Sequence, residues 1–143
     1  MSVELPSAPV DALIRRNAGG LRVSADATET LARGIQTRGA KIAVDAAERA
    51  DADGRKTIMA ADLGVDPAPR ADDLLLPIAP VDRIARLELD DRYRVGTDAR
   101  VALASLLEAY ADEVAAGAAL LARHADRRTI QAEDVETYFE LVE

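Results

Sequence analysis

The 143-residue sequence contains no cysteine and no tryptophan, and only four of its residues are aromatic. Without cysteine the chain can form neither a disulfide framework nor a thiolate metal site. No apolar run approaches the roughly eighteen residues of a membrane-spanning helix, and the first residues lack the basic and apolar segments of a signal peptide. We therefore expect a cytoplasmic protein. Nearly half of the sequence is apolar, and its alanine and leucine favour packed helices over a sheet.

Lysine is scarce as well. Lys41 and Lys56 are the only two lysines, beside 16 arginines, and 26 acidic residues bring the formal net charge to −8. All of the excess acid lies in residues 71–143, with 16 acidic and 8 basic residues, whereas residues 1–70 contain ten of each. Such a surface is expected of a protein that works in concentrated salt, where repulsion between like charges is screened. An ordinary acidic cytosolic protein is the alternative.

The chain contains an internal duplication, which decides how its fold is read. Seven of the eleven positions in residues 5–15 are identical to the positions 71 residues later. One inserted residue between positions 87 and 93 changes the offset to 72, and 14 of the 41 positions in residues 23–63 then match residues 95–135. We expect a first repeat over residues 1–64, a linker over 65–75 and a second repeat over 76–143.

Each repeat is predicted to contain a short helix, a long helix and a third helix. The short helices, residues 10–17 and 81–87, follow proline pairs that suit a helix start. The long helices begin near Ser24, a plausible N-cap, and near Thr97, and in the second repeat apolar residues recur at helical spacing. A helix of 25–28 residues is about 40 Å long, too long for one repeat to cover, so the two long helices should pack together.

The third helix should run from about residue 131 to residue 139 or beyond in the second repeat. In the first repeat Gly64, Pro67 and Pro69 should end it soon after Leu63. Residues 64–75 then form a polar linker that spans at most about 40 Å, enough to carry the chain to the second repeat.

Three motifs resemble those of archaeal histones: residues 76–80 (LPIAP), 121–125 (LARHA) and 128–134 (RTIQAED). Because they agree in order and spacing, and recur in drifted form in the first repeat, the chain resembles the fused two-repeat histones of halophilic archaea. The resemblance implies an all-α protein of two tandem histone folds, clasped in a handshake within one chain. It also implies double-stranded DNA as a partner, and no cofactor or membrane.

The resemblance further implies which residues face DNA. An arginine of the first helix enters the minor groove, and an arginine before the long helix and a basic residue with threonine in the second loop meet phosphates. Ala12 stands where the first repeat would carry its groove arginine, and two further arginines, one turn on in each first helix, could contact the backbone. The expected residues are Arg83, Arg94, Arg128, Thr129, Arg22, Lys56, Thr57, Arg15 and Arg86. Solvated surface arginines are the alternative.

Two pairs seven residues apart, Arg127 with Asp134 and Arg55 with Asp62, correspond to family salt bridges that hold the second loop to the third helix. In the family a leucine, a histidine and an aspartate join two handshake dimers, and these map to Leu121, His124 and Asp134. Arg49 and Ala52 replace the first two in the first repeat, which predicts a dimer of doublets joined through the second repeats. Asp72-Asp73 and Asp90-Asp91 lack the alternation of a calcium loop, so we expect no metal there.

Two functions remain open from the sequence. The first is a nucleoid-associated DNA-binding protein that bends or wraps duplex with little sequence preference. The second is a histone-fold regulator that binds selected DNA weakly, or proteins, and influences transcription without packaging. The recurring loop arginines favour the first, whereas Ala12 and the acidic charge favour the second. No constellation of acid, base and nucleophile surrounds His124, so an enzyme is not expected.

Overall fold

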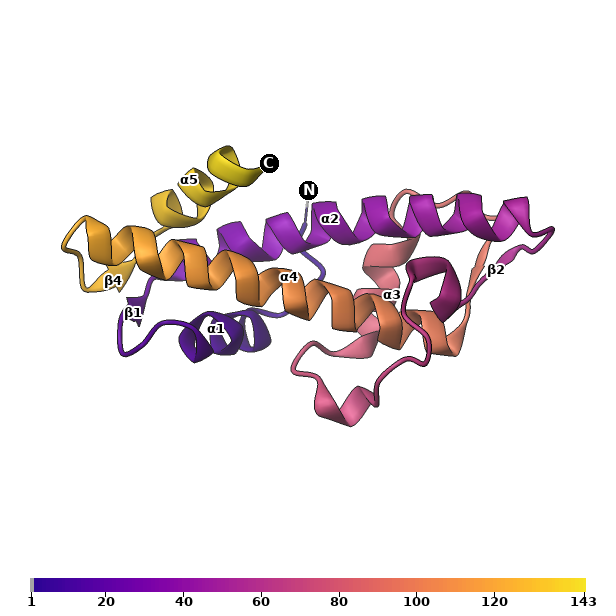
Figure 1. The fold of residues 1–143 in the computed structure, drawn as a ribbon, viewed down its shortest axis with the longest axis horizontal. Helices are drawn as coiled ribbons and strands as arrows, with labels where there is room; N and C mark the ends of the chain where they lie inside the picture. The colour runs from indigo at the N-terminus through magenta and orange to yellow at the C-terminus, as the bar shows by residue number, and fades with distance from the viewer. Residues whose placement is uncertain (1) are drawn as a thin grey trace.

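The computed structural model describes residues 2–143, and two long helices span its length (Figure 1). These are α2 (Ala25–Ala52) and α4 (Thr97–His124), which pack against each other. The short helix α1 (Ser7–Arg16) packs on both long helices, and α3 (Ile78–Arg86) does the same near the opposite end. The predicted pairing of two helical repeats within one chain is confirmed.

Both short helices begin three residues earlier than predicted. They start at Ser7 and Ile78 rather than at residues 10 and 81, with Pro6 and Pro77 as extended N-cap residues. Pro9 and Pro80 therefore lie inside the first helical turn, where the N–H that proline lacks would have no intrahelical partner. The prolines permit the earlier start instead of preceding it. The long helices begin as predicted, and the Ser24 hydroxyl accepts a hydrogen bond from the Ala27 amide at 3.0 Å.

Four strands of two residues each connect the repeats crosswise, a feature that the sequence did not predict. Strand β1 (Arg22–Val23) pairs in parallel with β4 (Thr129–Ile130), and β2 (Thr57–Ile58) pairs with β3 (Arg94–Val95). Each pair joins the loop before one long helix to the loop after the other. The two loops at each end of the molecule are therefore held together by backbone hydrogen bonds.

The third element differs between the repeats. In the second repeat it is the helix α5 (Ala132–Val142), and in the first it is only a 3-10 turn, η1 (Ala60–Leu63), which ends at Gly64 in the left-handed conformation. This early end was predicted. A second 3-10 turn, η2 (Ala71–Asp73), lies in the linker.

Helix α5 approaches both long helices closely at two glycines. A Cβ added at Gly34 of α2 would lie 2.6 Å from the ring of Phe139, and one at Gly117 of α4 would lie 2.3 Å from the ring of Tyr138. Seventy-two residues away, the corresponding positions are occupied by Leu106 and Asp45. The glycines that let a third helix pack closely against the long helices in the second repeat therefore have no counterparts in the first repeat.

One apolar core runs through the molecule and includes residues of both repeats. Ile35 of α2 and Leu107 of α4 occupy corresponding positions, and both side chains are fully buried in the same cluster. Across the described residues, 2–143, neither repeat has a separate core. Among residues 2–143, no helix is both long and apolar enough to cross a membrane.

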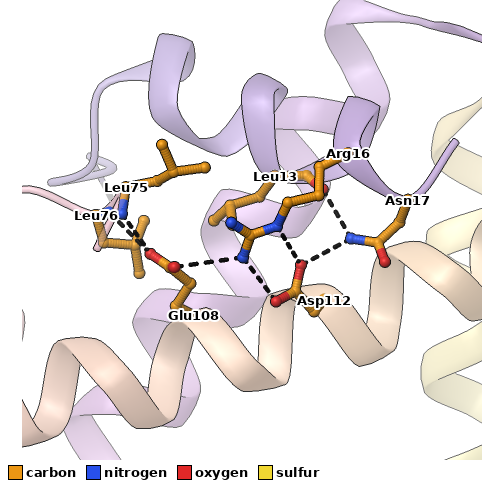
Figure 2. A network of polar contacts seen from close by, with 7 residues as sticks. All are labelled: Leu13, Arg16, Asn17, Leu75, Leu76, Glu108 and Asp112. Carbon is orange, nitrogen blue, oxygen red and sulfur yellow. Dashed lines mark hydrogen bonds and ion pairs between the residues drawn. The ribbon is translucent and has the colours of Figure 1, made fainter. Parts of the chain in front are cut away.

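A polar network holds α1, α4 and the end of the linker together (Figure 2). The buried Glu108 carboxylate accepts hydrogen bonds from the Leu75 and Leu76 amides at 2.7 and 3.1 Å and from Arg16 at 3.3 Å. Arg16 also donates to both carboxylate oxygens of Asp112, at 3.0 and 2.7 Å, and Asn17 donates to Asp112 at 2.7 Å. The network thus fixes the end of α1, from which the loop to β1 begins.

Candidate nucleic-acid interface

The predicted phosphate-contacting residues lie in two places, at opposite ends of the molecule (Figure 1). We call residues 17–24 with residues 123–131 the β1–β4 end, and residues 51–59 with residues 89–96 the β2–β3 end. At the first, the Arg22 amide donates to the Arg128 carbonyl at 2.9 Å, and at the second the Arg94 amide donates to the Lys56 carbonyl at 2.8 Å. The duplication therefore produces the same backbone arrangement twice.

At the β1–β4 end the structure brings together Arg22, Arg128 and Thr129. Arg22 and Arg128 are exposed, and within residues 2–143 neither guanidinium has a carboxylate partner. Arg22 pairs in register with Thr129 across the two strands. The two charges are therefore available to an anion from outside the chain.

At the β2–β3 end the corresponding residues are Arg94, Lys56 and Thr57, and Arg94 pairs in register with Thr57. The Lys56 ammonium lies in a very short contact with the Asp51 carboxylate, and it also lies 5.4 Å from the centre of the Tyr93 ring. The hydrogen bond from Lys56 is the main reason that the pKa of Asp51 lies below its usual value. Lys56 is thus paired within the chain, in an ion pair whose two side chains are both about half exposed.

The arginines of the two short helices are also paired. Arg83 lies 3.0 Å from Glu4, Arg15 lies 2.6 Å from Asp11 and Arg86 lies 3.1 Å from Asp82. All three guanidinium groups are largely exposed, so these ion pairs contribute little stability and can exchange for phosphate. Ala12, the counterpart of Arg83, adds no charge.

The two loop salt bridges are present. Arg55 lies 2.8 Å from the nearly buried Asp62, and Arg127 forms a very short contact with Asp134, whose side chain is 2% exposed. Each aspartate also accepts the backbone amide three residues earlier, Met59 or Gln131, at 2.8 Å. The hydrogen bonds from Arg55 outweigh burial and lower the pKa of Asp62, so that it stays ionised. These arginines brace the loops from within.

The predicted joining residues differ in exposure. His124 is the exposed last residue of α4 and Leu121 is half-buried, whereas Asp134 is buried and bonded to its own chain. In the first repeat Arg49 occupies the position of Leu121 and donates to the Asp62 carbonyl at 2.8 Å. The corresponding end of α2 therefore presents a charged side chain laid over η1.

Some residues of the interface were not foreseen from the sequence. Arg123 at the end of α4 reaches across to the first repeat and donates to the Ala18 carbonyl at 2.8 Å. Arg16 and Glu108 belong to the network of Figure 2. The contacts of Arg16 with Glu108 and of Arg123 with Ala18 join residues 92 and 105 positions apart in the chain, so no local pattern signals them. Within residues 2–143 no group of three or more His, Asp or Glu side chains is placed to hold a metal ion.

Comparison with known proteins identifies the family. The model of the histone-like transcription factor (CBF/NF-Y) and archaeal histone family matches this chain twice, over residues 3–65 and 74–137. The chain belongs to this family. Its fold, two tandem histone folds in an intrachain handshake, is thereby confirmed.

Individual archaeal histones are also similar. The archaeal histone HAN1 of Thermococcus zilligii is 53% identical over 60 residues, which make up 42% of this chain and 87% of that protein. The crystal structure of the histone from Methanopyrus kandleri matches with a TM-score of 0.71 at 29% identity, covering 94% of this chain and 92% of that one. Both histone folds of this chain therefore find their counterpart within one polypeptide. A Thermus thermophilus structure with a TM-score of 0.69, 22% identical over 98% of this chain and 99% of that one, shares the fold.

Proposed function

We propose that this histone-fold chain binds double-stranded DNA in the nucleoid and bends or wraps it with little sequence preference. Loop arginines, Lys56 and the two threonines would contact phosphates at both ends, and Arg83 would enter the minor groove between them. The observation that carries the proposal is the repeated arrangement in which two parallel strand pairs place Arg22 and Arg94 at opposite ends of one rigid body. Two anchoring points separated by the length of a long helix favour a bent duplex.

The chemistry of these groups suits a duplex backbone. Guanidinium groups bind phosphate through paired hydrogen bonds and keep their charge at any physiological pH. No contact needs a particular base, which accounts for low sequence preference. We propose no catalytic role and no cofactor.

A second function is favoured by specific observations. Ala12 leaves the first repeat without a groove arginine, and Arg83 is paired with Glu4 in the free protein. The net charge of −8 opposes general coating of DNA. A transcription regulator of this histone fold, which binds selected sites weakly or contacts proteins without packaging the genome, would show these features. The acidic, lysine-poor composition also supports work in concentrated salt, in which phosphate contacts weaken.

Titration of a labelled duplex across a range of KCl concentrations tests DNA binding. We expect wild-type affinity to fall steeply as KCl rises, and Arg83→Ala and Arg128→Ala each to weaken binding and reduce that dependence. Absence of binding at every salt concentration, or binding indifferent to both changes, would contradict the first function. Binding confined to a few genomic sequences would support the second.

We also propose that two chains join through their second repeats to form a dimer of doublets. His124 and Leu121 at the end of α4 are available for this contact, and the neighbouring Leu120 is 66% exposed. The first repeat offers Ala52 and the tethered Arg49 instead. Sedimentation should show a dimer that His124→Ala weakens and that Ala52→Ser leaves intact; a wild-type monomer at high salt would refute the assembly.

A further inference from the structure

The two ends of the molecule differ sharply in charge although their backbones correspond. The β1–β4 end contains four basic residues and one acidic residue, Asp126. The β2–β3 end, compared over the same number of residues at an offset of 72, contains four basic residues and four acidic ones, which are Asp51, Asp53, Asp90 and Asp91. The formal charge over these residues is +3 at one end and zero at the other. Glu133 and Asp134, which pair with Arg127, lie just outside the first set, and Asp62, which pairs with Arg55, lies just outside the second.

Contacts within the chain extend this difference. At the β2–β3 end Lys56 is bound by Asp51, Arg55 lies 3.1 Å from Asp53, and Arg92 lies 3.9 Å from Asp90. Arg94 alone among the four basic residues has no carboxylate partner within residues 2–143. Phosphate that approached this end could contact Arg94 directly, but it would have to displace carboxylates to reach the other three basic residues.

At the β1–β4 end only Arg127 is occupied by carboxylates, those of Glu133 and Asp134. Arg22 and Arg128 have none within residues 2–143, and Arg123 is bonded to a neutral carbonyl, that of Ala18. One end of the molecule thus contains Arg22 in β1, Arg123 near the end of α4 and Arg128 directly before β4. Backbone hydrogen bonds join the segments that contain Arg22 and Arg128.

Arg123 lies directly against Gly19. The glycine has a positive φ of 58°, and a Cβ at this position would lie 2.3 Å from the Arg123 Nη2 atom. Arg123 therefore crosses the loop of the first repeat directly against Gly19, whose left-handed conformation favours glycine, and it is held there by the Ala18 carbonyl. The position 72 residues earlier is Asp51, the residue that neutralises Lys56. At these corresponding positions, Arg123 adds a positive charge to the β1–β4 end, whereas Asp51 pairs with a positive charge at the β2–β3 end.

We propose that the β1–β4 end is the principal anchor for the phosphodiester backbone of duplex DNA, with Arg22 and Arg128 as contacts and Arg123 as the residue that positions the loop and adds charge. The β2–β3 end contributes through Arg94 alone until its carboxylates are displaced. A single chain then holds the duplex more tightly at the β1–β4 end than at the β2–β3 end, so the two directions along the DNA are not equivalent. The inference rests on the proposed DNA binding and specifies which part of the surface performs it.

Matched double variants test the polarity, because the duplication supplies equivalent positions. Arg22→Ala with Arg128→Ala removes two charges at the β1–β4 end, and Arg94→Ala with Lys56→Ala removes their counterparts. Fluorescence anisotropy of a labelled duplex across KCl concentrations gives the affinity and its salt dependence. We expect the first variant to lose at least about tenfold in affinity and to reduce the slope of log K against log salt by about 2, and the second to reduce it by less than about 1.

Single substitutions at the corresponding positions 51 and 123 provide the second readout. We expect Arg123→Ala to weaken DNA binding and Asp51→Ala to strengthen it, because the latter frees Lys56. Arg123→Lys should recover part of the lost salt dependence by restoring the charge. Unfolding midpoints of all variants identify any loss that comes from folding.

The outcomes separate the inference from the proposed function. Equal losses in the two double variants, or a larger loss at the β2–β3 end, would overturn the polarity and leave DNA binding intact. Wild-type binding that neither double variant weakens would overturn it as well and direct the search to another surface. A wild type that binds no duplex at any salt concentration would end both the proposed function and the inference.

Discussion

The β1–β4 end and the β2–β3 end use the same two backbone hydrogen bonds to hold a loop of one repeat against a loop of the other. Each also keeps a buried aspartate, Asp134 or Asp62, bound to an arginine seven residues earlier. The side chains that face outward differ: one end has three guanidinium groups with no carboxylate partner within residues 2–143, and the other has a set of internal ion pairs. The two repeats thus share the hydrogen bonds and salt bridges that hold the loops and differ in the charged side chains on the outer surface of the loops.

Scaffold and surface therefore respond to different demands. A buried aspartate that loses its arginine leaves an uncompensated charge, which is costly in any setting. An exposed arginine that gains an aspartate beside it costs almost nothing in stability. Exposed charges at one end were therefore free to change.

The core should not share this asymmetry. Ile35→Ala and Leu107→Ala remove corresponding, fully buried side chains from one cluster. We expect each to lower the free energy of unfolding by about 2–5 kcal/mol. Because neither repeat has a core of its own, denaturant unfolding followed by circular dichroism should show a single transition for both variants. Two separate transitions in either variant would mean that the repeats fold independently.

Substitutions in the polar network of Figure 2 should lower the stability more than substitutions at the corresponding position of the first repeat. Glu108→Ala leaves the amides of Leu75 and Leu76 without their acceptor, and we expect it to lower the free energy of unfolding by about 1–3 kcal/mol. Its counterpart Gln36 accepts from the Glu4 amide at 2.8 Å and donates to the Ser2 carbonyl at 2.9 Å. Gln36→Ala should lower the free energy of unfolding by less, because the Glu4 amide and the Ser2 carbonyl can form hydrogen bonds with water instead.

Glu108→Gln is the control for that comparison, since it retains an acceptor for the two amides and removes only the charge facing Arg16. Its loss should be smaller than that of Glu108→Ala. Equal losses in Glu108→Ala and Gln36→Ala would show that the linker end is held by other contacts.

A smaller effect concerns pH. Burial acts to raise the pKa of Asp112, but the hydrogen bonds from Arg16 and Asn17 together bring it below its usual value. A depressed carboxyl pKa adds stability above the unfolded value, near 4, and this contribution is lost as the pH falls through the folded value. We expect Asp112→Asn to flatten the decline in stability between about pH 5 and pH 3, by less than about 1 kcal/mol because the pair is partly exposed.

Much of this fold could be predicted from the sequence. The duplication, the length of the long helices and the early end at Gly64 all follow from local patterns. The helix starts at Ser7 and Ile78 were missed because a proline in the first turn looks the same in the sequence as a proline before it. The two-residue strands were missed because their partners come from different repeats and are too short to show any periodicity.

The candidate interface was harder to foresee. Positions such as Arg22 and Arg128 follow from the family motifs, but the motifs do not show which charges the chain neutralises itself. Lys56 was expected to face DNA, and its contact with Asp51 depends on how a loop folds back on the end of a helix. Arg123 stands inside a family motif, and its contact with Ala18 exists only because the other repeat lies beside it.

Transfer of the charge pattern from one end to the other tests this asymmetry most directly. The variant with Asp51→Arg, Asp53→Ala, Asp90→Ala and Asp91→Gly gives the β2–β3 end the residues found 72 positions away. Anisotropy titration against KCl should show tighter DNA binding than wild type and a slope of log K against log salt steeper by about 2 or more, as further phosphates are engaged. Unchanged affinity and slope in a folded variant would contradict the claim that these carboxylates keep one end of the molecule from holding DNA.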